Sequence, residues 1–95
     1  MKLKVGMYVR TINGKIWIIT SQKAISGHRK DIIKASYNII DLIEVGDYVN
    51  GWKVLYWTDG TKIIDDGYTT DLNKVDIKSI VTKEQFEQMS YKVGE

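Results

Sequence analysis

The 95-residue chain has no cysteine, no proline and a single histidine, His28. Without thiols it can form no disulfide framework, no thiolate zinc site and no cysteine nucleophile. Its apolar runs are far shorter than the roughly 18 residues that cross a bilayer, and its first residues show no signal-peptide pattern. We therefore expect a soluble protein of the cytosol, with no membrane partner.

Net charge is also small. Fourteen Lys and Arg residues against twelve Asp and Glu give a formal charge of +2, and the two signs are interspersed. Apolar residues make up 43% of the chain, which is too many for a disordered protein with so little net charge. A chain of this length buries roughly 60 to 65% of its unfolded surface, enough for one core. We predict a single domain over residues 1–95.

The composition favours strands. Val, Ile and Thr number 29 and the aromatic residues 10, whereas Ala and Leu together number six. Branched and aromatic side chains suit a pleated, half-buried surface, and the best helix formers are scarce. Asn-Gly at 13–14 and 50–51 and Asp-Gly at 59–60 lie between apolar runs, which is a strong hairpin signal. The sequence predicts a mostly β fold, as a small antiparallel barrel or a curled sheet of hairpins.

A two-residue turn at Asn13-Gly14 would determine the register of the first hairpin. It places Arg10 opposite Trp17 and separates the side chains into two faces. The predicted core face carries Val5, Met7, Val9, Thr11, Ile16 and Ile18. The predicted outer face carries Tyr8, Arg10, Ile12, Lys15, Trp17 and Ile19.

A three-strand meander is predicted over residues 45–49, 52–58 and 61–65. Its turns place Tyr48 opposite Lys53 and Trp57 opposite Lys62, so cations again lie across from rings. The predicted core face carries Val45, Val49, Trp52, Val54, Tyr56 and Ile63. The predicted outer face carries Tyr48, Lys53, Leu55, Trp57, Lys62 and Ile64.

The remaining segments carry weaker patterns. Residues 21–31 are polar and read as a long loop, followed by a strand over 31–36, and 37–43 fits either a strand or a short turn. Alternation predicts a strand over 74–81. Thr82 and Gln85 form a capping box that begins a short helix over 83–89, and 91–93 fits a closing strand.

Two blocks of the sequence echo each other. Val-Gly-Met-Tyr-Val at 5–9 and Val-Gly-Asp-Tyr-Val at 45–49 agree at four of five positions, and an Asn-Gly pair follows each. The echo indicates either a duplicated hairpin or a chance match in a chain rich in these residues, since solenoid repeats need at least three units.

Three segments carry a resemblance. NIIDLIEVGDYVNGWK at 38–53 and IKSIVTKEQFEQMSYKV at 77–93 resemble small uncharacterised proteins encoded by phages and prophages of low-GC Gram-positive bacteria. The opening VGMYVRTINGKIWII also resembles the first hairpin of Src-homology-3-like barrels of the KOW type. The first resemblance implies a protein that works inside an infected or lysogenic bacterium. It implies no activity and no site residues.

Residues suited to catalysis are few. General acid–base chemistry needs ionisable groups held in a pocket, and His28 lies beside Arg29 and Lys30 in a polar segment with no second His to share a metal. Asp65 and Asp66 are adjacent, so on a strand they would point to opposite faces, and with Gly67 they fit a turn. No glycine-rich phosphate loop occurs. We expect no enzyme activity, no catalytic residue, no bound metal and no cofactor.

Two binding functions remain. The aromatic and basic outer faces fit docking on a host or defence protein, or self-association into a homo-oligomer, and the small net charge favours this reading. The residues predicted to bind a partner are Tyr8, Arg10, Lys15, Trp17, Tyr48, Lys53, Trp57 and Lys62. The alternative is a small β-barrel that binds nucleic acid through aromatic stacking and phosphate contacts. Its candidate phosphate contacts are Lys23, His28, Arg29, Lys30 and Lys34.

Overall fold

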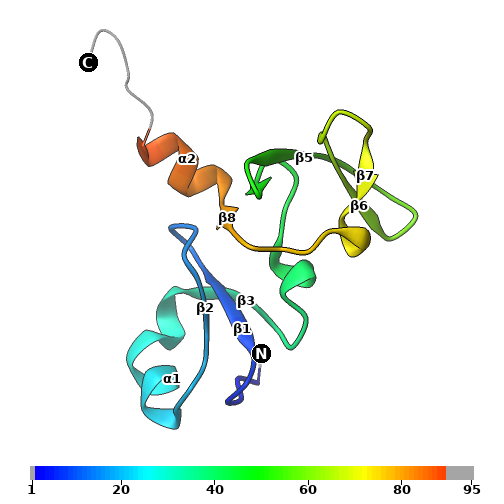
Figure 1. Ribbon diagram of the computed structural model, residues 1–95. Coiled ribbons are helices and arrows are strands. Elements are labelled where there is room, and N and C mark those ends of the chain that lie inside the picture. Colours follow the sequence, from blue (N-terminus) through cyan, green and yellow to red (C-terminus); the bar gives the residue numbers. More distant parts are fainter. Residues whose placement is uncertain (1, 90–95) are drawn as a thin grey trace, which may run out of the picture. The chain divides into compact units, whose positions relative to one another are not determined.

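The structure is a computed structural model that describes residues 2–89. Contacts between residues divide the chain into two units, Met1–Ile43 and Glu44–Glu95. Each unit is built on an antiparallel sheet (Figure 1), so the mostly β class is confirmed. Within residues 2–89 neither sheet closes into a barrel, and no helix has the length and apolar character needed to span a membrane. The single domain stays a prediction.

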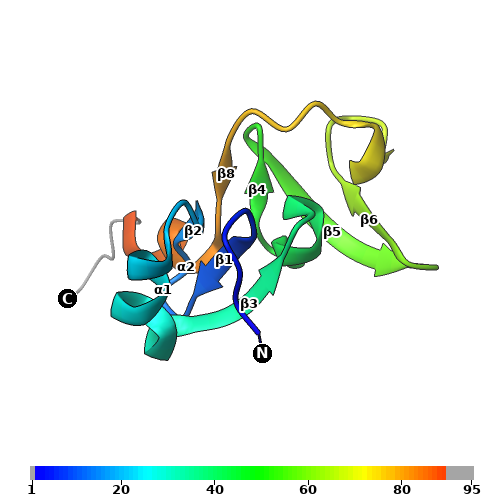
Figure 2. The same cartoon turned by 90° about the horizontal axis from the view of Figure 1, so that it is seen from below.

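Unit 1, residues 1–43, contains a three-stranded sheet with strand order β2-β1-β3. Two helical segments connect β2 to β3, and a short one follows β3 (Figure 2). The strands are β1 (Tyr8–Thr11), β2 (Ile16–Ile18) and β3 (Ile32–Ser36). The helical segments are α1 (Gln22–His28) and the 3-10 helices η1 (Arg29–Asp31) and η2 (Ile39–Leu42).

Helix α1 replaces the predicted loop over residues 21–31, so that prediction is wrong. The Ser21 hydroxyl caps the helix by accepting a hydrogen bond from the Ala24 N–H (3.3 Å). Ile25 is buried and fastens the helix to the core of unit 1. A single apolar anchor in a polar segment is too weak a pattern to predict a helix, and tertiary packing supplies the rest of its stability.

The core of unit 1 lies on one face of this sheet. It consists of five buried apolar side chains, with three partly buried residues packed against them. The buried residues are Leu3, Val9, Ile19, Ile25 and Ile32, and the partly buried ones are Met7, Trp17 and Ala35.

The first hairpin differs by one residue from the predicted register. The Thr11 N–H donates to the Lys15 carbonyl (2.9 Å), which leaves a three-residue loop over 12–14. Gly14 has φ +86°, as in a three-residue loop that ends in a glycine bulge. Trp17 therefore lies opposite Val9, and Arg10 lies opposite Ile16.

The shift of one residue exchanges the two faces of β2 relative to β1, while the side chains of β1 keep their predicted alternation. Arg10 was predicted on the outer surface, but it is fully buried and its Nη1 donates to the Leu42 carbonyl at the end of η2 (3.0 Å). Ile19, also predicted outside, is buried in the core. Val5 and Ile18, predicted in the core, are exposed. Trp17, predicted on the outer face, is partly buried against the core beside Val9. These five placements are corrections to the predicted faces.

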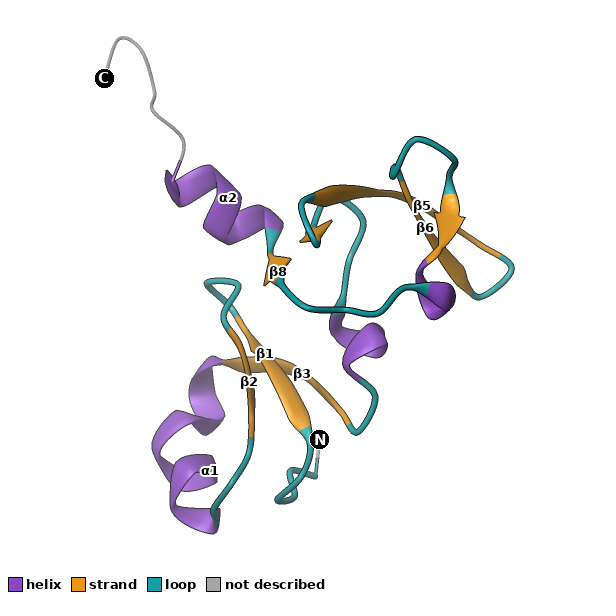
Figure 3. Cartoon of the chain, in the orientation of Figure 1, coloured by secondary structure: helices purple, strands orange, loops and turns teal. Residues whose placement is uncertain are grey.

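Unit 2, residues 44–95, contains a five-stranded sheet with strand order β7-β6-β5-β4-β8 (Figure 3). The strands are β4 (Tyr48–Val49), β5 (Trp52–Thr58), β6 (Thr61–Ile64), β7 (Thr70–Asp71) and β8 (Ile80–Val81). The 3-10 helix η3 (Leu72–Lys74) follows β7, and helix α2 (Lys83–Met89) follows β8.

Both turns of the predicted meander are confirmed. Asn50-Gly51 and Asp59-Gly60 have positive φ at both positions, which is the type I′ geometry that matches strand twist. As predicted, Tyr48 pairs with Lys53 and Trp57 pairs with Lys62.

A bulge in β5 changes the predicted faces of this hairpin. The register shifts between Val54 and Tyr56, so Val54 pairs with Ile64 while Tyr56 pairs with Ile63. Ile64 is consequently buried, although it was predicted on the outer face. Three residues predicted in the core are exposed: Val45, Trp52 and Tyr56.

Helix α2 begins and ends within the predicted 83–89, and its capping box is present. The Gln85 N–H donates to the Thr82 hydroxyl (3.3 Å), and the Thr82 N–H donates to the Gln85 side-chain oxygen (3.1 Å). Strand β8 covers only the end of the predicted strand over 74–81, and 37–43 forms a short 3-10 turn. The predicted closing strand over 91–93 lies outside the described residues.

Candidate functional site

The charges of the chain are separated between the two units. Residues 1–43 hold eight Lys and Arg against two Asp, a formal charge of +6, whereas residues 44–95 hold six against ten, a formal charge of −4. The small charge of the whole chain therefore conceals a basic unit and an acidic one. The expectation of interspersed charge is wrong at this scale, and a count taken over each half of the sequence would have found the difference.

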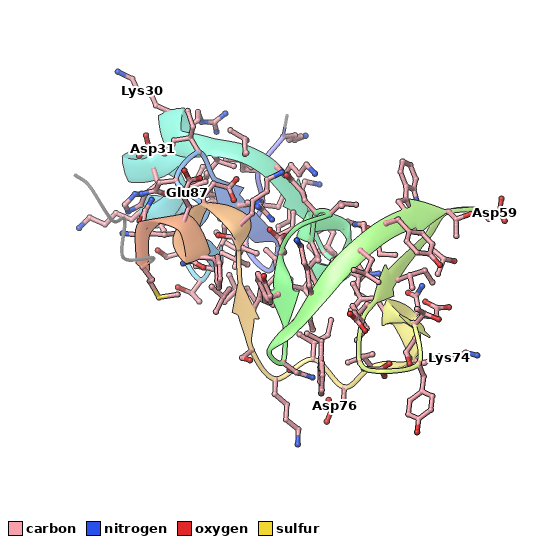
Figure 4. All side chains as sticks on the ribbon, turned by 90° about the horizontal axis from the view of Figure 1, so that it is seen from above. Lys30, Asp31, Asp59, Lys74, Asp76 and Glu87 are labelled. Carbon is pink, nitrogen blue, oxygen red and sulfur yellow. The ribbon has the colours of Figure 1, made fainter. Side chains whose placement is uncertain are left out.

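The five candidate phosphate contacts all lie in unit 1, on the two helical segments that connect β2 to β3 and on β3 itself. Lys23 and His28 belong to α1, Arg29 and Lys30 to η1, and Lys34 to β3. All are exposed except Lys34, which is partly buried. Figure 4 shows the Lys30 side chain extending away from the ribbon. These residues are therefore close together in the sequence, on consecutive elements of one unit.

The eight residues predicted to bind a partner are divided between the units. Tyr8, Arg10, Lys15 and Trp17 lie in unit 1, and Tyr48, Lys53, Trp57 and Lys62 lie in unit 2. The Tyr48 ring stacks on Phe86 of α2 (centroids 4.7 Å apart, planes 24° apart). Arg10 is buried, as described above, so it is withdrawn as a contact residue.

A hollow of about 330 Å³ opens on unit 1 between β2 and α1. Trp17 and His28 meet inside it edge to face, with ring centroids 5.4 Å apart and planes at 67°. The residues that line it are Lys15, Trp17, Ile18, Thr20, Ala24 and His28. The predicted loop could not place His28 against Trp17, because that contact requires α1.

The hollow combines two aromatic rings with a cation. Aromatic faces and edges contact planar rings, and an ammonium group attracts anions such as phosphate. Among residues 2–89 no group of three or more His, Asp or Glu side chains is placed to hold a metal ion. What this site offers is contact surface and positive charge.

Unit 2 exposes several large aromatic side chains. Trp57 is 67% exposed, Tyr56 48% and Trp52 47%, all on β5, and Tyr68 is 88% exposed on the loop between β6 and β7. Figure 4 labels Asp59 at the tip of the β5–β6 hairpin, near the exposed Trp57 in sequence. These rings lie in the acidic half of the chain.

The loop that carries Tyr68 is held by an acidic side chain. The Thr70 hydroxyl donates to Asp66 Oδ2 (2.6 Å) and the Tyr68 N–H donates to Asp66 Oδ1 (3.0 Å). These hydrogen bonds stabilise the carboxylate and hold the pKa of Asp66 below its ordinary range. The Asp65 carboxylate accepts from the Gly67 N–H (3.3 Å), so both acids have the role in a turn that their sequence indicates.

No family model matches the chain. Neither the curated proteins nor the solved structures include a significant match to it. The function is therefore argued from the residues and their arrangement.

Proposed function

We propose that this chain is a non-enzymatic nucleic-acid-binding protein that contacts its ligand through unit 1. The observation that carries the proposal is the formal charge of +6 on residues 1–43. The whole-chain charge of +2 favoured a protein partner over nucleic acid. Once the charges are counted by unit, that preference is reversed.

The proposed contact residues suit a phosphate backbone. Lys15, Lys23, Arg29 and Lys30 are exposed, and long cationic side chains neutralise phosphates and release condensed counterions. The Trp17 and His28 rings lie with Lys15 in the hollow, and aromatic platforms combined with cations are the usual means of binding single strands. An acidic lipid surface would use the same cations but would have no use for a ring-lined hollow.

The test compares two charge-reversal variants that change the net charge equally. Arg29→Glu with Lys30→Glu alters the basic segment, whereas Lys74→Glu with Lys78→Glu alters two exposed lysines of unit 2. We expect the first pair to lower affinity for a labelled oligonucleotide by about tenfold or more at low salt, and the second to change it little. Fluorescence anisotropy measures both.

Salt dependence provides a second readout of the same experiment. The logarithm of affinity should fall linearly with the logarithm of salt concentration, by about 0.7 to 0.9 per phosphate neutralised. The Arg29 and Lys30 variant should flatten that slope by roughly 1 to 2. Equal losses in the two variants, or an affinity indifferent to salt, would contradict the proposal.

A second candidate function rests on a different observation, the exposed rings of β5. Docking on a host or defence protein is favoured by Trp57 and Tyr56, because interface hot spots are rich in such side chains. Trp57→Ala should abolish capture of that partner from nuclease-treated host lysate. Trp57 is 67% exposed, so the variant should keep the melting temperature of the parent. Capture that survives the change would remove this candidate.

The setting of either function is likewise a proposal. The resemblance of residues 38–53 and 77–93 to phage and prophage proteins places the activity inside an infected or lysogenic bacterium. The kinship of residues 5–19 with Src-homology-3-like barrels is a proposal about fold. Self-association through an exposed strand, measured as oligomeric state in solution, is the remaining proposed interaction.

A further inference from the structure

One side of the hollow on unit 1 is formed by aromatic side chains and one small side chain. Trp17 projects from β2, His28 ends α1, and Ala24 lies one helical turn before His28 with only a methyl group. A small side chain at that position leaves space beside the indole. Lys15 and Thr20 add a cation and a hydroxyl just before and just after β2.

The hollow is small compared with most ligand pockets. Its volume of about 330 Å³ is at the lower end of ligand pockets, which range over roughly 300 to 1,000 Å³. The hollow is open to solvent, and one planar base can cover it. In a duplex the bases are paired and stacked, so none of them can lie against Trp17 without first being flipped out.

Cations adjoin both sides of the α1 wall. Lys23 immediately precedes Ala24, and Arg29 immediately follows His28. Both cations are exposed, and Lys15 lines the hollow itself. The long side chains of Lys23 and Arg29 can reach phosphates on either side of a base held there.

We infer that the nucleic acid taken by this site is single-stranded, with one unstacked base against Trp17 and its flanking phosphates near Lys15, Lys23 and Arg29. This inference rests on the proposed function and narrows it to one class of ligand. Single strands offer bases that stack on aromatic side chains without prior melting.

Fluorescence tests the inference directly, because the chain has three tryptophans and two of them lie on β5. In the full chain with Trp52→Phe and Trp57→Phe, Trp17 is the only indole. A 12-nucleotide oligo-dT should quench its emission and bind about tenfold more tightly than the matched 12-base-pair duplex at equal salt. The duplex should leave the emission nearly unchanged.

A pair of variants on α1 separates occupation of the hollow from general charge. Ala24→Glu places a carboxylate inside the hollow, whereas Ser26→Glu adds the same charge at an exposed position of the same helix. We expect Ala24→Glu to lower oligo-dT affinity about tenfold more than Ser26→Glu. Both should lower duplex affinity to a similar extent.

The outcomes distinguish a preference for single strands from nucleic-acid binding in general. Equal affinity for single strand and duplex, with no quenching, would overturn the single-strand inference and leave nucleic-acid binding standing. Failure of both ligands to bind at low salt would overturn both. The quenching experiment alters no residue of the hollow, so it decides the question even where circular dichroism shows Ala24→Glu to be unfolded.

Discussion

Residues 5–9 and 45–49, which differ only at their third position, make the same turn in the two units. Gly6 and Gly46 have φ of +96° and +98°. The N–H of the following residue donates back three positions in each case, from Met7 to Lys4 (3.2 Å) and from Asp47 to Glu44 (3.0 Å). A turn with positive φ at its third residue favours glycine, which explains why both blocks hold it there.

The same two blocks also enter their sheets in the same way. The Gly6 N–H donates to the Ile19 carbonyl (2.8 Å), and the Gly46 N–H donates to the Val54 carbonyl (2.9 Å). Each block then leads into a central strand with an antiparallel neighbour on either side, β1 between β2 and β3 and β4 between β5 and β8. The two blocks therefore match in local structure as well as in sequence.

The hairpins that follow the two blocks differ. At Asn13-Gly14 the Thr11 hydroxyl donates to the Asn13 side-chain oxygen, and the loop has three residues. At Asn50-Gly51 the Asn50 side-chain oxygen accepts from the Lys78 and Ser79 N–H groups (2.8 and 3.0 Å), and the loop has two residues. The same dipeptide, Asn-Gly, therefore forms a different turn in each unit, and the asparagine side chain has a different hydrogen-bond partner in each.

The largest expected effect lies at the position where the blocks differ. Asp47 is buried, and its carboxylate accepts from the Glu44 and Lys83 N–H groups (2.7 and 2.9 Å). Asp47→Met, which copies the residue of unit 1, should lower the free energy of unfolding by about 3 kcal/mol, because two part-buried backbone donors lose their buried acceptor. Urea denaturation measures the loss. Asp47→Asn keeps one acceptor and should cost about half as much, and equal costs would contradict this account.

A smaller effect separates the two asparagines. Asn50→Ala should cost about 2 kcal/mol, since it removes the anchor for residues 76–79 and leaves alanine at φ +53°. Asn13→Ala, in an exposed loop, should cost about 0.5 to 1 kcal/mol. Thermal denaturation compares them, and a reversed order would break the proposed contrast between the turns.

The glycines should respond alike. An added Cβ would meet Tyr37 at 3.6 Å beside Gly6 and Lys83 at 3.5 Å beside Gly46, which are ordinary contacts. Gly6→Ala and Gly46→Ala should therefore each cost about 1 to 2 kcal/mol from backbone conformation alone. If chemical denaturation gave costs that differ by more than about 1 kcal/mol, the two turns would not be equivalent in energy.

The smallest effect concerns acid and belongs to the acidic unit. The lowered pKa of Asp66 means that its ionised form is favoured in the folded state. Its contribution to stability is present above the pKa of the unfolded chain and is lost as pH falls through the lower folded pKa. Thr70→Val removes the main cause and should raise the pKa of Asp66 toward its ordinary value. Carboxyl NMR titration measures this, and an unmoved pKa would assign the shift elsewhere.

The sequence predicted correctly those features that are formed by residues close together in the chain. The capping box of α2 and the type I′ turns at 50–51 and 59–60 involve residues within a few positions of one another. Prediction failed where a longer loop or a bulge shifts the register by one residue. The loop at 12–14 displaced the register of β1 and β2, and the bulge in β5 exchanged the faces of Tyr56 and Ile64.

The candidate site was predicted in part for the same reason. The basic residues of 23–34 could be recognised from their type alone, and all five lie in unit 1. Arg10 lies on the predicted face of β1, and its burial was missed because it depends on η2, whose Leu42 carbonyl accepts from it. The Trp17–His28 contact was missed because it needs α1, whose only buried residue is Ile25.

Composition and local sequence determined the mostly β class, the glycine turns and the final helix. Branched side chains, helix caps and positive φ all act over a few neighbouring residues. Only the tertiary structure decided where the chain divides into two units. It also decided which rings are covered. These properties depend on which distant segments pack together. Side-chain alternation alone does not predict this, because a register shift of one residue exchanges the two faces of a strand.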